Sequence, residues 1–578
     1  MDFKFAMTLK ELRHRTSKTY FKGIKFLSET DRKVKRLSAE DKLVLMHLTR
    51  AAKIMDTINF KLENPLNMEF LEFLNNQADA GDEKAALARK MFLAQKSMFS
   101  PDTLGNQTVL VKDVKKYDGM GYFPTDLTVE EFHEILNRMV DDGEIKEVQQ
   151  ILSQRTVVKR AGDKLVAVDF VDEFAEFKEM AKELELAKEH STDRSFNKYL
   201  DLQIKALMKA DPKLDAKADI AWAKLERSKF EFTITRECYD EALTKSIYEN
   251  EELLKKLKDN NIVVYAKDSL GARVGIVNKS GTRLLKKLKD LVKVSARCMP
   301  YADEYETLID STEEKTKQVA VDVDLVTLTG EEGAYQASIV LAQNLPNDDK
   351  LSLSMGGGRR NVYHRQIRKR SNKKLYKALI CEDQFKFYNP EADHWAVICH
   401  ENTHSLGPKS HNVLGKYSAI LEEFKADMGM YAFLDEFEKA GHFSENQIKQ
   451  IMVTSLAKSF PKGKPNLDQA HRVRAVMICN RMLTEKAIVF NGEKLAFDFG
   501  KIIKTAKTMM AEVIRLQIDA NVKKAGEYVD KWFVWSKDIE AVAEIIKKYS
   551  KALNGYIITP LADEFLKEDY EKKLKANA

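Results

Sequence analysis

The pentapeptide HENTH, from His400 to His404, constrains the fold of this chain more than any other stretch. On an α-helix, side chains four residues apart lie on one face, about one turn apart. The two imidazole rings can therefore meet at one point only if this stretch is helical. The preceding segment NPEADHWAVIC favours a helix with apolar residues for a core, and Gly407-Pro408 is expected to end it.

This spacing suits the ligand geometry that tetrahedral zinc takes from two histidines. Glu401, next to the first histidine, can reach a water on the metal without occupying the metal itself. In a chain of this composition, an HExxH pattern arises by chance with odds on the order of one per cent. The competing interpretation is a pair of histidines on a solvated helix face, and the pentapeptide alone leaves it open.

A third ligand is expected from the helix-like segment LEEFKADMGMYAFL, in which Glu423 follows His404 by nineteen residues. Two histidines and this glutamate make a three-ligand set for one Zn²⁺ per chain, with a fourth position left for water. Glu422 and Asp427 are assigned to the surroundings of the metal, where Asp427 can accept a hydrogen bond from a ligand imidazole. EExxAD alone is typical of a solvated face, but its place after HExxH favours the metal interpretation and the gluzincin type of metallopeptidase.

A zinc site of this kind activates water for hydrolysis. Zinc lowers the pKa of its bound water to about 7 and polarises a carbonyl group. Glu401 is the predicted base, which takes the proton of the water and later delivers it to the leaving amine. The developing oxyanion needs a hydrogen-bond donor besides zinc.

Further segments extend the metal motif into a family pattern. HENTH followed by EEFKAD resembles the dipeptidyl peptidase III family of zinc exopeptidases. The segment around QAH resembles the family stretch whose histidine donates to the tetrahedral intermediate, a role that would fall on His471. The segment NLPN resembles the family's substrate strand, in which asparagines hold the peptide backbone, and Asn344 and Asn347 occupy those positions.

A weaker likeness lies in ITRECYDEAL. In the family, a glutamate at this place accepts the free α-amino group, and a tyrosine binds the substrate and supports the intermediate. These roles would fall on Glu237 and Tyr239, while Tyr248 and Glu249 in IYENEEL form a rival alignment. The resemblance covers residues 230–530 or so, and the segment before it matches only in being helical.

The resemblance implies an α+β fold that is predominantly α-helical, with two lobes separated by a wide cleft. One lobe is helical and bears zinc, and the other combines helices with a five-stranded β-barrel. The β-prone runs at 229–239, 317–330 and 335–346 fall where that barrel belongs, and SMGGGRRN (354–361) is expected to be a loop.

The division of the chain between the lobes is coarse, because the chain is expected to cross between them more than once. The expected parts are a lower lobe (1–257), a helical segment of the zinc lobe (258–316), the barrel and substrate strands of the lower lobe (317–372), the catalytic helical zinc lobe (373–524) and a C-terminal helical segment (525–578).

Several positions depart from the family pattern. The pentapeptide replaces the hexapeptide of many members, and the interval to the third ligand is shorter than in the eukaryotic forms. Lys425 stands where an arginine is common, and Ala525 stands where an arginine would contact the C-terminal side of the peptide. Lys523 or Lys524 is the candidate replacement. These changes leave the zinc chemistry intact and leave the dipeptide register and the substrate preference open.

Length and composition fit a cytoplasmic enzyme of several domains. The 578 residues are too many for one core, so about two to four domains are expected. A net charge of +6 is dilute on this length and does not by itself argue for nucleic acid. The five cysteines are scattered and odd in number, which favours a reducing compartment over a disulfide framework. The chain shows no signal-peptide apolar region and no run of about 18 apolar residues, so no membrane partner is expected.

Three functions remain in competition. The first is a zinc exopeptidase, a monomer or homodimer, that releases dipeptides from short peptides with a free N-terminus and binds no nucleic acid. The second is a zinc aminopeptidase or endopeptidase on the same scaffold. The third is a non-enzymatic protein that binds nucleic acid or an acidic partner through the basic run 359–374, although sparse aromatic residues favour a solvated or cleft-lining face there. His394 and His411, which flank the motif, are expected at the surface or beside the ligands.

Overall fold

The buried apolar side chains of the computed structural model form two large clusters and a small one. The first cluster surrounds the largest sheet, and we call this part the sheet lobe. The second takes its residues from between 285 and 546, mostly from the helices after residue 372, and this part is called the helical lobe. The small cluster lies among N-terminal helices. The structure describes residues 3–18, 21–101, 107–209, 211–225, 227–238, 241–288, 290–306, 319–334, 342–345, 360–368, 372–408, 413–467, 469–549 and 554–576.

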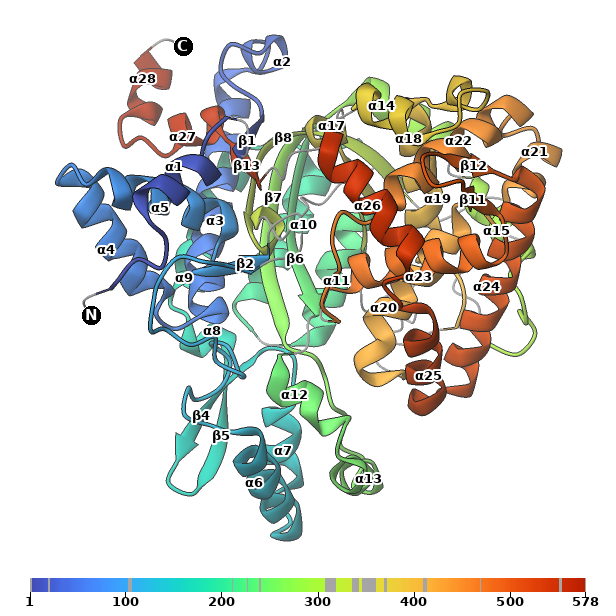
Figure 1. The fold of residues 1–578 in the computed structure, drawn as a ribbon. Coiled ribbons are helices and arrows are strands. Elements are labelled where there is room, and N and C mark those ends of the chain that lie inside the picture. Colours follow the sequence, from blue (N-terminus) through green and yellow to red (C-terminus); the bar gives the residue numbers. More distant parts are fainter. Residues whose placement is uncertain are drawn as a thin grey trace.

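Five strands form the sheet at the centre of the molecule (Figure 1). Their order across the sheet is β6-β7-β8-β10-β9, with antiparallel pairing throughout except between β8 and β10. Among the described residues the two edge strands do not pair with each other, so the five strands form a half-barrel where a small barrel was expected. The strands are β6 (Phe230–Cys238), β7 (Asp268–Val277), β8 (Val319–Gly330), β9 (Ala342–Leu345) and β10 (Arg360–His364).

One of these strands corrects the sequence-based expectations: β7 lies within 258–316, which was predicted to be helical. β10 lies within 317–372, the segment assigned to strands, although its first two residues were expected to belong to the loop 354–361. β7 is buried on both faces, so it lacks the polar–apolar alternation that marks a half-buried strand. Gly275 is required there because a Cβ atom would overlap Val323 on β8. The helical part of this segment begins only with α14 (Lys279–Leu288) and α15 (Leu291–Arg297).

The long helix α3 (Ala39–Glu63) packs across the sheet. Ser38 is its N-cap and forms a capping box with Asp41. The other elements of the sheet lobe surround this core. They are α2 (Arg32–Lys35), α6 (Val129–Asp141), α7 (Ile145–Ile151), α8 (Phe170–Glu173), α9 (Glu176–His190), α10 (Arg194–Leu207), α11 (Pro212–Ala223), α12 (Ala242–Ile247), α13 (Glu251–Asp259), α17 (Arg365–Arg368) and the hairpin β4–β5 (Thr156–Ala161, Lys164–Asp169).

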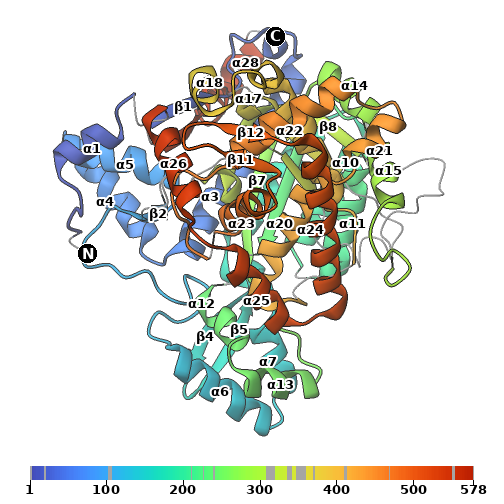
Figure 2. The same ribbon diagram turned by 45° about the vertical axis from the view of Figure 1, so that its right-hand side comes forward.

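The helical lobe holds the HENTH pentapeptide at its centre. Figure 2 shows its helices gathered in front of the sheet. Its elements are α18 (Lys373–Leu379), α19 (Pro390–Thr403), α20 (Ser418–Gly429), α21 (Leu434–Lys439), α22 (Glu445–Ser459), α23 (Ala470–Thr484), β11 (Ile488–Phe490), β12 (Leu495–Phe497), α24 (Phe499–Asp519), α25 (Val522–Trp532) and α26 (Lys537–Tyr549).

The C-terminal segment returns to the sheet lobe after α26, so it is not helical throughout as expected. β13 (Asn554–Ile558) pairs in parallel with β1 (Phe21–Lys25), and α27 (Pro560–Phe565) and α28 (Tyr570–Ala576) follow. The small N-terminal cluster is built from α1 (Leu9–Arg15), α4 (Asn67–Asp79), α5 (Glu83–Gln95), β2 (Phe99–Pro101) and β3 (Gln107–Val109). Among the described residues, none of the helices combines the length and the apolar character that crossing a bilayer requires.

Candidate metal centre

Helix α19 brings the two motif histidines to one point. Asn389 caps its N-terminus and Pro390 occupies the first turn, where a missing N–H costs nothing. The helix ends earlier than expected, at Thr403, but His404 is its C-cap and keeps helical dihedral angles, so the one-turn spacing survives. The Nε2 atoms of His400 and His404 lie 3.1 Å apart.

Helix α20 supplies the third donor. Glu423 places one carboxylate oxygen 3.4 Å from His400 Nε2 and the other 3.8 Å from His404 Nε2. One donor atom from each of the three residues lies within 4.8 Å of the others. The close packing of α20 on α19 depends on Gly429, because a Cβ atom there would overlap the side chain of Thr403.

A carboxylate contacts the Nδ1 atom of each imidazole ring. Asp427 Oδ1 lies 2.8 Å from His400 Nδ1, and Glu422 Oε1 lies 3.0 Å from His404 Nδ1. Lys425 Nζ in turn lies 2.8 Å from Glu422 Oε1. With Nδ1 of each ring engaged in this way, Nε2 is the nitrogen that faces Glu423, which is the arrangement that orients histidines for a metal.

The charge states of this set also fit a cation. Burial lowers the pKa of His400 to about 3, which keeps the imidazole in the neutral form that binds metals. Burial acts to raise the pKa of Glu423, but the neighbouring His471 and His404 hold it well below its usual value, so the carboxylate is ionised. Two imidazole nitrogens and one anionic carboxylate oxygen are a donor set that Zn²⁺ accepts.

Helix α23 adds two residues to the centre. His471 Nδ1 lies 3.1 Å from Glu423 Oε2, and its side chain is 57% exposed, so the ring sits at the solvent side of the set. Arg474, one turn later, forms an ion pair with Asp427, and its Nε lies 3.6 Å from Glu423 Oε2. Sequence reasoning missed Arg474, although its spacing of three residues from His471 puts both on one helix face.

Glu401, the predicted base, is buried next to the donor set. The guanidinium group of Arg474 interacts electrostatically with Glu401. Burial lowers the pKa of this guanidinium, and the carboxylates of Glu423 and Glu401 act against that shift. The backbone carbonyl oxygen of Glu401 accepts a hydrogen bond of 2.8 Å from Asn344 Nδ2, on strand β9.

The predicted substrate-binding residues are only partly described. Asn344 is buried, and its amide group contacts the HENTH segment. Asn347 and Tyr239 lie outside the described residues, and for Glu237 the structure describes the backbone, which pairs with Ser269 in the sheet, but not the side chain.

The rival pair behaves differently. Tyr248 Oη lies 3.5 Å from the carbonyl oxygen of Val264, and Glu249, which is 59% exposed, pairs with Lys416. These contacts give neither residue a place beside Glu423.

A second buried cluster of charges lies within the sheet. Arg360 Nη2 donates to Glu231 Oε2 over 2.8 Å, and Arg273 Nη1 lies 2.9 Å from His364 Nε2 and 2.6 Å from Gln343 Oε1. Although burial acts to raise it, the two guanidinium groups hold the pKa of Glu231 below its usual value. Arg360 and His364 belong to the predicted basic run, so part of that run faces the core, neither solvated nor available to nucleic acid.

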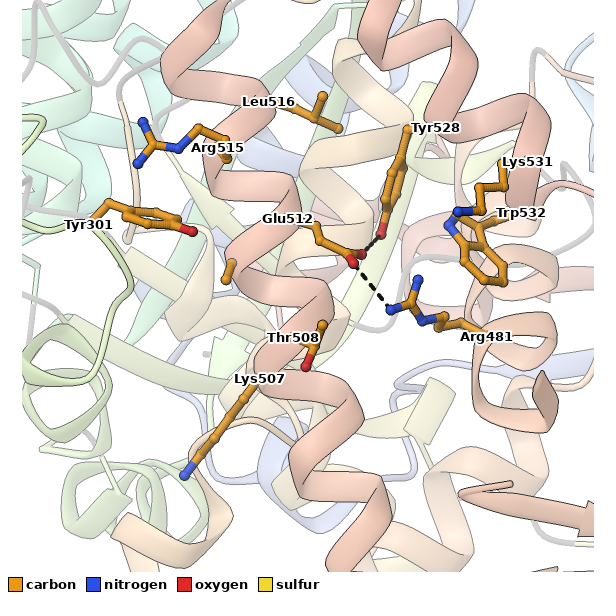
Figure 3. A pocket seen from close by; sticks show the side chains of 11 residues that line it. Tyr301, Arg481, Lys507, Thr508, Glu512, Arg515, Leu516, Tyr528, Lys531 and Trp532 are labelled. Carbon is orange, nitrogen blue, oxygen red and sulfur yellow. Dashed lines mark hydrogen bonds and ion pairs between the residues drawn. The ribbon is translucent and has the colours of Figure 1, made fainter. Parts of the chain in front are cut away.

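A hollow on the outer side of α24 is separate from the metal centre (Figure 3). Both arginines of the hollow are paired within the protein: Arg515 with Glu304 at 2.6 Å and Arg481 with Glu512 at 3.1 Å. Tyr528 also donates to Glu512, over 2.9 Å. Nothing in this arrangement points to a ligand. It is lined by Tyr301, Arg481, Lys507, Thr508, Ala511, Glu512, Arg515, Leu516, Tyr528, Lys531 and Trp532.

His394 contradicts the expectation of a surface residue or a neighbour of the ligands. Its side chain is buried, and its ring packs edge-on against Tyr363 of β10, with 5.4 Å between the ring centroids. His411, the other flanking histidine, lies outside the described residues. Cys399, next to the first motif histidine, is a buried thiol.

Comparisons with known proteins concern the whole chain. No family model matches the sequence. The sequence is similar to Nudix hydrolase 3 of Arabidopsis thaliana, with 21% identity over 593 residues that cover 92% of this chain and 72% of that protein.

The structure is similar to dipeptidyl peptidase III of Caldithrix abyssi, with a TM-score of 0.74 and 23% identity, covering 96% of this chain and 100% of the other. It is also similar to dipeptidyl-peptidase III of Corallococcus sp. strain EGB, with a TM-score of 0.79 and 20% identity, covering 98% and 99%. The fold predicted from the resemblance is thereby confirmed: the chain has the two-lobed α+β fold of dipeptidyl peptidase III.

Proposed function

We propose that this protein is a zinc-dependent exopeptidase that releases dipeptides from the free N-terminus of short peptides. The observation that carries the proposal is the convergence of His400, His404 and Glu423, whose donor atoms lie within 4.8 Å of one another. The Nδ1 atoms of the two histidines contact carboxylates. The three residues lie in a fold that is shared with known dipeptidyl peptidases.

In this proposal His400, His404 and Glu423 hold one Zn²⁺ ion. Bound there, the ion supplies a Lewis acid that polarises the scissile carbonyl and lowers the pKa of a water molecule to about 7. Glu401 takes the proton of the attacking water and delivers it to the leaving amine. His471, at the solvent side of the set, donates a hydrogen bond to the developing oxyanion.

The substrate contacts in the proposal rest on the family resemblance. Glu237 accepts the free α-amino group, and Tyr239 supports the oxyanion together with His471. Asn344 and Asn347 hold the backbone of the first substrate residues. Asn344 lies at the end of β9 that meets the HENTH segment, which supports its place in this group.

Metal analysis and peptide cleavage test the proposal together. The purified protein is expected to hold about one zinc per chain and to release dipeptides, read by mass spectrometry, from peptides with a free N-terminus. The matched control is the same set of peptides with acetylated N-termini, which should resist cleavage. Equal cleavage of both sets would replace the exopeptidase with an endopeptidase, and release of single residues would indicate an aminopeptidase.

The remaining parts of the proposal concern the surroundings of the reaction. Short peptides are the expected partners, with no nucleic acid or membrane involved, and the protein acts as a monomer or homodimer. The scattered cysteines support a cytoplasmic location. A protein that holds no zinc after gentle purification would favour a non-enzymatic binding function instead.

A further inference from the structure

Helix α19 has a second functional face, which lies away from the metal ligands. His394, Asn402 and Ser405 follow one another at intervals of eight and three residues, so they share one side of the helix. This side meets strands β9 and β10 of the sheet lobe, where His394 packs on Tyr363 and Ser405 Oγ lies 3.3 Å from Asn344 Nδ2.

Three asparagines connect this face to the sheet, and we call them the asparagine clasp: Asn344, Asn361 and Asn402. Asn344 and Asn361 are direct partners across the β9–β10 pair, and Asn344 Nδ2 donates to Asn361 Oδ1. Asn361 Nδ2 donates to Asn402 Oδ1 over 3.0 Å. Asn344 Nδ2 also contacts the carbonyl oxygen of Glu401, at 2.8 Å.

The clasp is buried, which gives its hydrogen bonds a strong directional effect. Asn344, Asn361 and Asn402 are 6%, 1% and 3% exposed. A buried amide without a partner costs the desolvation of that group, so the hydrogen bonds that Asn344 Nδ2 and Asn361 Nδ2 donate favour this arrangement over one that shifts the strands and the helix apart. The helix is therefore held at a fixed depth against the strands.

This fixed depth bears directly on Glu401. Asn344 donates to the backbone carbonyl oxygen of Glu401, and Asn361 donates to the side chain of the next residue, Asn402. The histidines on the other side of α19 are held independently by Asp427 and Glu422 of α20. The helix segment is thus fixed from two directions: α20 sets the imidazole rings, and β9 and β10 set the backbone that carries the base.

We propose that Asn361 and Asn402 are positioning residues, which set Glu401 relative to the peptide that lies along β9. This inference rests on the proposed function, since it assigns the clasp to the same reaction. Neither residue belongs to the metal donor set, and each acts through the backbone of α19. A displacement of about 1 Å in a reacting group can lower a rate about 100-fold, so loss of the clasp should appear in kcat.

The variants Asn361→Leu and Asn402→Leu remove the hydrogen bonds with little change in volume, and alanine versions replace any that fail to fold. With zinc content held at one per chain, each is expected to lower kcat about 10- to 100-fold and to leave KM within about threefold. Both residues act through one contact, so their effects should not multiply. The kcat of the double variant should lie within about twofold of the kcat of the slower single variant.

The matched control is Asn67→Leu, in the small N-terminal cluster. Asn67 is also fully buried, and its side chain makes hydrogen bonds with Phe60 and Met98. Its loss should lower the melting temperature by a similar amount and leave kcat unchanged. If the clasp variants match this control in kcat, or if their losses multiply in the double variant, the positioning role is overturned.

The wild-type protein separates this inference from the proposed function. If the wild type holds zinc and releases no dipeptides, the proposed function fails. If the wild type releases dipeptides and Asn361→Leu does so at the same kcat, the function stands and the clasp inference alone fails.

Discussion

The metal centre and the charge cluster in the sheet both bury charged groups beside histidine, yet they are built in opposite ways. In the sheet, Arg360 donates to Glu231, and Arg273 lies against His364 and Gln343, so each group faces a protein partner. In the metal centre, three donor atoms converge, and two of them are imidazole nitrogens. Pairing of opposite charges indicates a structural role, whereas convergence of like donors indicates a place for a cation.

The largest expected effect is a loss of kcat on substitution of Glu401, beside the metal centre. Glu401→Gln keeps the size of the side chain and removes the base, so kcat for dipeptide release should fall about 100- to 10,000-fold. Zinc content, measured on the same sample, should stay at one per chain, because Glu401 is not among the converging donors. Full activity of this variant would show that Glu401 is not the base.

A comparable change in the sheet should act on stability and leave the chemistry unchanged. Glu231→Gln leaves the buried guanidinium groups of Arg360 and Arg273 without their counter-charge, which should lower the free energy of unfolding by about 3–5 kcal/mol. Chemical denaturation measures this loss. The kcat of the remaining folded protein should match the wild type, and a selective loss of kcat would contradict the structural role.

Between these extremes lies Asp427, which is in contact with a ligand and is not itself among the converging donors. Asp427→Asn should weaken zinc binding about 10- to 100-fold, because the imidazole of His400 loses the carboxylate that orients it. Competition with a chelator of known affinity gives the number. Unchanged affinity would show that Arg474 and the helix packing orient the ring without this carboxylate.

The smallest effect is expected in the hollow outside α24. Arg515→Gln breaks an exposed ion pair with Glu304, which should lower the melting temperature only slightly and leave both kcat and zinc content unchanged. Thermal unfolding together with the peptide assay checks both. A clear loss of activity would assign this hollow a part in the reaction that its paired charges do not indicate.

Local spacing made the metal centre predictable, whereas contacts between distant segments were not. His400, His404 and Glu423 could be grouped because helical spacing within HENTH and the short interval to the next helix determine where they meet. Arg474 was within reach of the same argument, since it lies one turn from His471.

The sheet shows where such reasoning ends. β7 reads as a run without alternation because both of its faces are buried, and β10 carries Arg360 and His364, which sequence patterns place at a surface. The pairing of Asn361 with Asn344 joins strands whose connecting residues carry no local sign of the register. Tertiary burial, and not propensity, decides these positions.

The parallel pairing of β1 with β13 has a consequence for how the protein is made. Asn554–Ile558 is synthesised more than five hundred residues after its partner Phe21–Lys25. The helical lobe, whose core lies between residues 285 and 546, can therefore pack before that partner strand exists. The two-stranded sheet of β1 and β13 forms only afterwards, so its assembly can follow the packing of the helical lobe.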